Sequence, residues 1–173
     1  MKGIVIYQGK YGATEQYAEW LAEELDIPVV SAADEHEEIS NYDYFVIGSS
    51  VYIGKLVIRH WLKKNLANIN TRKIFFFLVS GTSPHETEKL ESYLHSGIPD
   101  TMRKKIDVIF LPGKLDIKKL SWMDRFLLRM GARLEKDDAI KKGMLTEYNQ
   151  VKKENLAGLI EKVKSFLGKS IPV

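Results

Sequence analysis

Residues 3–14 read Gly3-Ile4-Val5-Ile6-Tyr7-Gln8-Gly9-Lys10-Tyr11-Gly12-Ala13-Thr14. The apolar first half predicts a buried strand, and the two glycines predict a turn. Thr14 is a candidate N-cap for a helix, because four apolar residues that follow it share one helical face: Ala18, Leu21, Ala22 and Leu25. A strand, a glycine-bearing turn and an amphipathic helix in this order are typical of the first part of a βαβ unit.

The same alternation continues along the chain. Further runs rich in β-branched and aromatic residues predict strands at 27–30, 44–48, 74–79 and 108–111. Helical periodicity predicts helices at 58–69, 84–94 and 156–167. Strands that alternate with helices predict an α/β fold with a doubly wound five-stranded parallel sheet and helices on both faces.

About 35 residues separate the fifth predicted strand from the last helix, more than a strand-to-helix connection needs. Apolar residues repeat there at helical spacing: Leu120, Met123, Phe126, Leu127, Met130 and Leu134. We therefore expect a single domain over residues 1–173 with a helical insertion at about 113–146. The composition, 45% hydrophobic and 28% charged, is that of a globular chain.

The composition also excludes several kinds of chemistry. The chain has no cysteine, so disulfides, iron–sulfur clusters and thiol chemistry are excluded, and redox activity needs a bound cofactor or a metal without cysteine ligands. The four histidines lack metal-ligand spacing and no serine stands in a nucleophile elbow, so we expect no metal site and name no catalytic residue. The apolar start of the chain turns polar at Gln8, which is too early for a signal segment or a membrane span and predicts a cytoplasmic protein.

Positive charge is concentrated in and around the insertion. Residues 103–142 contain twelve Lys and Arg against six Asp and Glu, whereas the net charge of the chain is +3. Such a patch can attract anionic lipid, an acidic partner or an anionic substrate, and is too modest to predict nucleic-acid binding. On an ideal helix Arg125, Arg129 and Arg133 form a cationic stripe. With Trp122 they are candidates for contact with a substrate or with the inner face of a membrane; the alternative is a surface helix whose apolar stripe covers the sheet.

The segment after the first strand is the first candidate binding site, because ligands of a parallel sheet gather at the carboxyl ends of its strands. Glycines let the backbone approach an anion, helix-end amides stabilise phosphate, and a lysine adds charge. The candidate residues are Gln8, Gly9, Lys10, Tyr11, Gly12, Ala13 and Thr14. The alternative is a plain glycine-containing turn that Thr14 caps.

Two further segments follow the third and fourth strands. In the first, small residues and Tyr52 suit a flat heterocycle on which the tyrosine stacks, unless Tyr52 only packs over the sheet end. In the second, small polar groups suit a pyrimidine edge, or form only a helix cap and a turn. The candidate residues are Ser50, Val51, Tyr52, Ile53, Gly54, Ser80, Gly81 and Thr82.

At these positions the chain resembles the flavodoxin superfamily, whose phosphate loop reads Ser/Thr-x-Thr-Gly-x-Thr. Gly12 and Thr14 match that pattern, while Gln8 and Lys10 replace its first two hydroxyl residues. The resemblance implies a flavodoxin-like sheet and flavin mononucleotide (FMN) as the cofactor.

Within that superfamily the chain looks most like the menaquinone-dependent protoporphyrinogen IX dehydrogenase group, which has a helical insertion after the fifth strand. The similar segments are Tyr42-Asp43, Phe45-Val46-Ile47-Gly48-Ser49-Ser50, Gly54, Trp61-Leu62-Lys63-Lys64, Leu111-Pro112-Gly113-Lys114-Leu115, Trp122-Met123-Asp124-Arg125-Phe126-Leu127-Leu128 and Thr146-Glu147-Tyr148. The resemblance implies an FMN-dependent oxidoreductase of porphyrin biosynthesis that oxidises protoporphyrinogen IX and passes electrons to a quinone.

Two other functions stay open. One is an FMN electron-transfer protein of the flavodoxin type that serves protein partners, although carriers of this fold usually dock through acidic surfaces. The other is a structural role without flavin.

Overall fold

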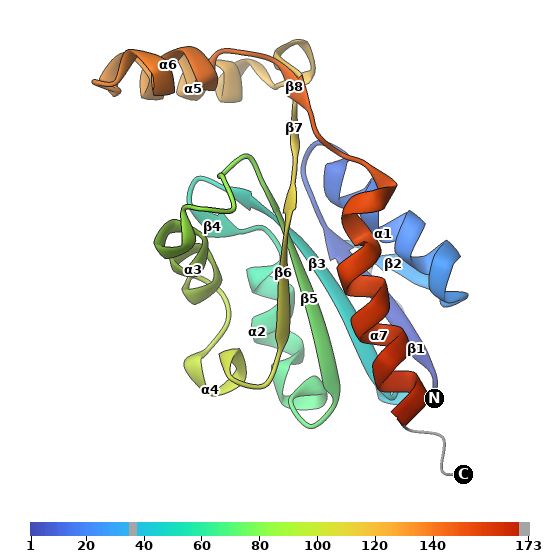
Figure 1. Ribbon diagram of the computed structural model, residues 1–173. Coiled ribbons are helices and arrows are strands. Elements are labelled where there is room, and N and C mark those ends of the chain that lie inside the picture. Colours follow the sequence, from blue (N-terminus) through green and yellow to red (C-terminus); the bar gives the residue numbers. More distant parts are fainter. Residues whose placement is uncertain (35–37, 170–173) are drawn as a thin grey trace.

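Five parallel strands form the central sheet of the computed structural model, which describes residues 1–34 and 38–169 (Figure 1). They lie in the order β2-β1-β3-β5-β6. Their bounds are β1 (Gly3–Gln8), β2 (Val29–Ser31), β3 (Tyr44–Tyr52), β5 (Lys73–Ser80) and β6 (Asp107–Pro112). Strand order reverses at β1, which is the doubly wound arrangement that the sequence predicted.

The third strand is longer than the sequence predicted and ends in a hairpin. β3 continues to Tyr52 and turns back into β4 (Lys55–Leu56), which pairs with it antiparallel and adds a sixth strand to the sheet. The turn residues Ile53 and Gly54 have φ values of 48° and 69°. Two central residues with positive φ are typical of a two-residue hairpin turn. The expectation that the segment after Gly48 is a loop is therefore wrong for Ser49 to Tyr52.

Helices cover both faces of the sheet (Figure 1). One face carries α1 (Ala13–Leu25) and α7 (Ala157–Lys169); the other carries α2 (Arg59–Ile69), α3 (Thr87–His95) and α4 (Asp100–Arg103). Short 3-10 turns, η1 (Ile39–Asn41) and η3 (Lys153–Leu156), precede β3 and α7. Because strand side chains alternate between faces, Phe45 and Ile47 join the apolar layer under α2 and α3, whereas Val46 joins the layer under α1 and α7. The four predicted helices are confirmed, and α4 is additional.

The first helix begins differently from the prediction. Its N-cap is Gly12, with φ 78° in the left-handed region that favours glycine, and not Thr14. Thr14 lies within the first turn, and its side chain is completely buried. A cap at Gly12 leaves the hydroxyl of Thr14 available for a purpose other than capping.

The insertion leaves the sheet through a two-stranded stem, in which β7 (Lys114–Leu115) pairs antiparallel with β8 (Tyr148–Asn149). Between these strands lie η2 (Ile117–Lys119), α5 (Trp122–Leu134) and α6 (Asp138–Met144). Figure 1 shows α5 and α6 together beyond the end of the sheet, away from the other helices. The predicted helix is confirmed as α5; α6 and the stem were not predicted. In the described part of the chain, no helix has both the length and the apolar character needed to cross a membrane.

Candidate cofactor site

The strand register brings the three predicted binding segments to one edge of the sheet. Gln8 at the end of β1 is paired with Ser49, and Ser50 is paired with Val79, one residue before Ser80. Since all of these strands are parallel, the residues that follow them share the carboxyl edge. Their part in binding a cofactor stays a prediction.

The first segment surrounds an uncapped helix N-terminus. No side chain within the described ranges caps α1, so the amides of its first turn have no side-chain acceptor. The hydroxyl oxygen of Thr14 is buried and has no hydrogen-bond partner among the residues that the structure describes. A Cβ atom on Gly9 would lie 2.8 Å from Thr14 Oγ1, so only glycine fits there. A buried hydroxyl without a partner beside free helix amides suits an anion such as phosphate.

Two lysines approach this segment, and the sequence identified the less suitable one. The ammonium of Lys10 lies 2.8 Å from Asp124 Oδ2 and 3.4 Å from the ring centroid of Tyr52, so its charge faces the insertion. The Nζ atom of Lys114, on β7, lies 3.6 Å from the position that a Cβ atom on Gly12 would take. Lys114 is therefore the cation beside the α1 N-terminus. Its sequence signal was its place just after the fifth strand, at the same edge.

Asp124 in the first turn of α5 is the most connected side chain of the site, and sequence reasoning did not select it. Only 7% of the residue is exposed. Its carboxylate accepts hydrogen bonds from the hydroxyls of Tyr52, at 2.6 Å, and of Tyr11, and it pairs with Lys10. Burial by itself would raise the pKa of Asp124, but the bonds from Lys10, Tyr11 and Tyr52 outweigh burial and hold this pKa well below its usual range. The carboxylate thus joins the insertion to the first two binding segments.

The second segment is divided between structural and available groups. Ser49 Oγ donates to the carbonyl of Ser50 at 2.8 Å and accepts from the amide of Ile58 at 3.3 Å, so it holds the start of α2. Ser50 Oγ is buried and finds no partner in the described chain. Val51 continues β3, while Ile53 and Gly54 form the exposed hairpin tip. In this segment Ser50 thus keeps a hydroxyl without a partner among the described residues, and Tyr52 bonds to the insertion.

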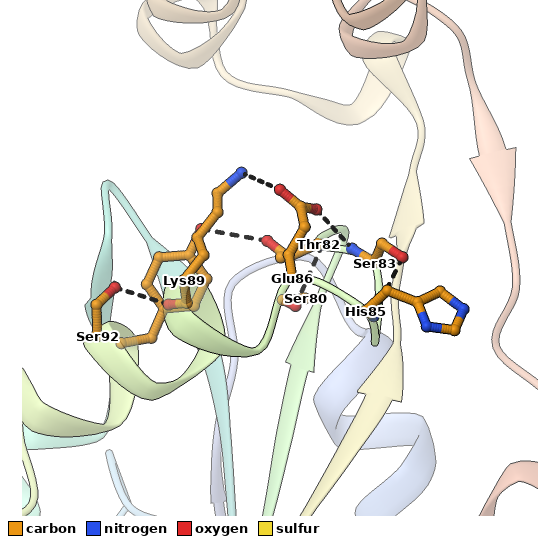
Figure 2. A network of polar contacts seen from close by, with 8 residues as sticks. Ser80, Thr82, Ser83, His85, Glu86, Lys89 and Ser92 are labelled. Carbon is orange, nitrogen blue, oxygen red and sulfur yellow. Dashed lines mark hydrogen bonds and ion pairs between the residues drawn. The ribbon is translucent and has the colours of Figure 1, made fainter.

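The third segment is held in shape by its own polar contacts (Figure 2). Ser80 Oγ accepts from the amide of Thr82 at 3.3 Å, and Thr82 Oγ1 lies 3.2 Å from the hydroxyl of Tyr93. A hydrogen bond from the amide of Ser83 and an ion pair with Lys89 lower the pKa of Glu86. Figure 2 shows the imidazole of His85 directed away from this network. Some of these contacts form a turn before α3, as the structural alternative for this segment expected. The contacts of Ser80 and Thr82 also hold these two side chains in place.

Tyr148 of β8 lies against the third segment from the insertion side. A Cβ atom on Gly81 would overlap the Tyr148 hydroxyl oxygen, so a side chain there would require this hydroxyl to move. A cavity of about 390 Å³ lies between the stem and the first segment; its lining includes Tyr11, Lys114, Leu120, Glu147 and Tyr148. A larger hollow of about 660 Å³ lies by α2 and the α3–α4 connection, and none of the predicted site residues lines it.

The outer face of α5 is apolar and exposed. Trp122 is 73% exposed, Phe126 56% and Leu134 77%, and Met123, Leu127 and Met130 are exposed as well. The alternative in which this stripe covers the sheet is therefore wrong: the residues that turn inward are Asp124 and Ala132. Arg129 and Arg133 are exposed and Arg125 is half-buried, and none of the three forms an ion pair with a residue that the structure describes. A cationic stripe thus borders an exposed apolar face.

The chain is similar to one family model and to several solved structures. The family model described as flavodoxin domain matches residues 4–141. A flavodoxin from the domain Archaea is 18% identical with a TM-score of 0.45, over 95% of this chain and 99% of that chain. A flavoprotein in complex with FMN from Lactobacillus acidophilus NCFM is 18% identical with a TM-score of 0.44, over 64% and 91%. A Fusobacterium nucleatum flavodoxin bound to FMN is 14% identical with a TM-score of 0.43, over 70% and 75%. None of the curated proteins compared with the chain matches it.

Proposed function

The chain belongs to the flavodoxin domain family, and from this premise we propose that it binds FMN at the carboxyl edge of its sheet and acts as a redox protein. The observation that carries the proposal is the buried hydroxyl of Thr14, which has no partner in the described chain and lies at the uncapped N-terminus of α1 with Lys114 nearby. Family membership supports FMN, the cofactor that the resemblance to the flavodoxin superfamily implied.

The phosphate of FMN fits the first segment. The first-turn amides of α1 and the Thr14 hydroxyl would donate hydrogen bonds to the phosphate oxygens, and Lys114 would supply a positive charge. Gly9 and Gly12 keep this space free of side-chain atoms. Lys10 contributes less, because Asp124 already neutralises it.

The flavin ring fits between the second and third segments. Lys10 covers one face of the Tyr52 ring, and the other face would be the one for flavin; Ser50, Ser80 and Thr82 would offer small polar groups for the polar edge of the flavin ring. Bound flavin supplies hydride and electron transfer, and the protein supplies orientation and charge. No side chain of this chain has to act as an acid or base for that chemistry.

We further propose that the protein is an enzyme that works at a membrane surface, with a porphyrinogen-like substrate and menaquinone as electron acceptor, as in the protoporphyrinogen IX dehydrogenase group that its sequence resembles. The exposed apolar face of α5 supports membrane contact, because basic residues border it and anionic lipid attracts such helices. The same arginines suit propionate carboxylates. An electron carrier that docks on proteins is the second candidate, and the basic charge of the insertion favours the enzyme.

Titration with FMN tests the cofactor proposal. We expect FMN to lose fluorescence and the melting temperature of the protein to rise as the complex forms. Thr14→Val, which keeps the shape but removes the hydroxyl, should weaken binding, and Thr87→Val on the exposed start of α3 is the matched control. A protein that leaves FMN fluorescence and its own melting temperature unchanged would contradict the proposal.

A turnover assay separates the two redox functions. FMN-loaded protein with anionic vesicles and a menaquinone analogue should oxidise protoporphyrinogen IX faster than FMN alone. If the protein binds FMN but does not oxidise protoporphyrinogen IX, the proposed enzyme function is eliminated and the electron carrier remains.

A further inference from the structure

One carboxylate connects the insertion to the flavin site. Asp124 belongs to α5, whereas two of its side-chain partners, Lys10 and Tyr11, follow β1, and the third, Tyr52, is the last residue of β3. Tyr11 and Asp124 are 113 positions apart in the sequence, and Tyr52 and Asp124 are 72 positions apart, so these contacts are tertiary. We call this group of four side chains the Asp124 cluster.

The cluster is built to hold a negative charge in one place. The Ser121 hydroxyl accepts from the Asp124 amide at 3.1 Å, which fixes the first turn of α5 on which the carboxylate stands. Oδ1 accepts from Tyr52, and Oδ2 accepts from Tyr11 and Lys10, so both oxygens are engaged. A largely buried carboxylate with this many donors resists displacement, because the loss of any one donor leaves the negative charge of the carboxylate poorly compensated.

The same helical turn has a second surface. Neighbouring residues on an α-helix point about 100° apart, so a turn that directs Asp124 inward directs Trp122, Met123 and Phe126 outward. An α5 that moves away from the body must break the Asp124 cluster, and a broken cluster releases both Tyr52 and Lys10. The position of the exposed apolar face and the shape of the flavin site are therefore linked through these four residues.

We propose that Asp124 is a positioning residue that fastens α5 to the flavin site by orienting Tyr52 and Lys10, so that FMN binding and the fastened position of α5 stabilise each other. The proposal rests on the FMN site described above. Reciprocity follows from linkage: if fastened α5 favours FMN, then FMN favours fastened α5 by the same factor.

Four variants test the proposal: Asp124→Asn, Tyr52→Phe, the double variant, and Asp138→Asn as control. Asp138→Asn removes the same charge from the exposed start of α6 in the same insertion. We expect Asp124→Asn and Tyr52→Phe each to weaken FMN binding about tenfold, and the double variant to be hardly weaker than either. Tyr52→Phe keeps the aromatic ring and the fold, so a loss of FMN affinity in this variant reports the positioning of the ring by the hydroxyl. The control should bind within twofold of the parent protein.

Hydrogen exchange of α5 supplies a second readout, and its comparison between variants needs no FMN. Amides of residues 122–134 should exchange faster in Asp124→Asn than in the parent protein or the control, and FMN should slow them in the parent protein but not in Asp124→Asn. Additive losses in the cycle, or α5 exchange that neither Asp124→Asn nor FMN alters, would overturn the inference while FMN binding by the parent protein keeps the proposed function. A parent protein that fails to bind FMN overturns both.

Discussion

The sheet with its helices and the insertion are held together by different forces. In the body, Phe45, Val46 and Phe77 are completely buried. In the insertion, the large apolar residues of α5 are mostly exposed. The Asp124 cluster attaches the insertion to the body, and the stem, with the hydrogen bond from the Ile117 amide to Glu147, closes its base. Burial of apolar surface stabilises the first region, and charge and hydrogen bonds position the second. An amphipathic helix in a sequence thus need not direct its apolar side toward its own core.

One pair of identical substitutions should show the largest contrast. Phe45→Ala removes a completely buried ring and should lower the free energy of unfolding by about 3–5 kcal/mol. Phe126→Ala removes a ring that is 56% exposed and should change it by less than about 0.5 kcal/mol. Urea denaturation of both variants measures the difference. A comparable loss in Phe126→Ala would mean that the outer face of α5 is covered in solution.

Acid should weaken the attachment of the insertion before it affects the apolar core. Because the folded pKa of Asp124 is lowered, its contribution is fully present above the unfolded value of about 3.9 and is lost as the pH falls below it. At pH 7 we expect Asp124→Asn to cost about 1–2 kcal/mol, a reduced figure since 37% of the Lys10 side chain is exposed. The gap between parent and variant, measured by urea denaturation, should narrow below about pH 4. A gap that is constant from pH 7 to pH 3 would contradict the assignment.

Two lysines cross the boundary between the regions in opposite directions. Lys10 of the body faces the insertion, whereas Lys114 of the stem faces the body at Gly12. We expect Lys114→Gln to weaken FMN binding about tenfold, which corresponds to about 1.4 kcal/mol, and Lys10→Gln to weaken FMN binding less than about threefold. Fluorescence titration at two salt concentrations measures both, and the Lys114 effect should shrink at high salt. A larger effect of Lys10→Gln than of Lys114→Gln would mean that Lys10, and not Lys114, contacts the phosphate.

The sequence was sufficient for features that depend on local periodicity. The strand runs and the helical stripes each span a few turns or residues, so five parallel strands and α1, α2, α3, α5 and α7 were predictable. The hairpin after β3 was not, because its turn places Ile53, a β-branched residue, at positive φ, where such residues are rare.

The site needed tertiary information. Thr14 and Gly12 both suit a helix start, and only the backbone shows that Gly12 is the cap. The choice between Lys10 and Lys114 and the role of Asp124 depend on residues more than 70 positions apart meeting at one edge. Periodicity identified the apolar stripe of α5, but it carries no information about which side of the helix faces the body.

The paired strands β7 and β8 bring the two ends of the insertion together, since Lys114 lies opposite Asn149 and Leu115 opposite Tyr148. The chain therefore leaves the body after β6 and returns to it before α7 at one point. Segments of other lengths can be exchanged at such a junction without rerouting any strand, because closing a loop between adjacent ends costs little that depends on its length. The insertion could thus be replaced while the sheet and its carboxyl edge are kept.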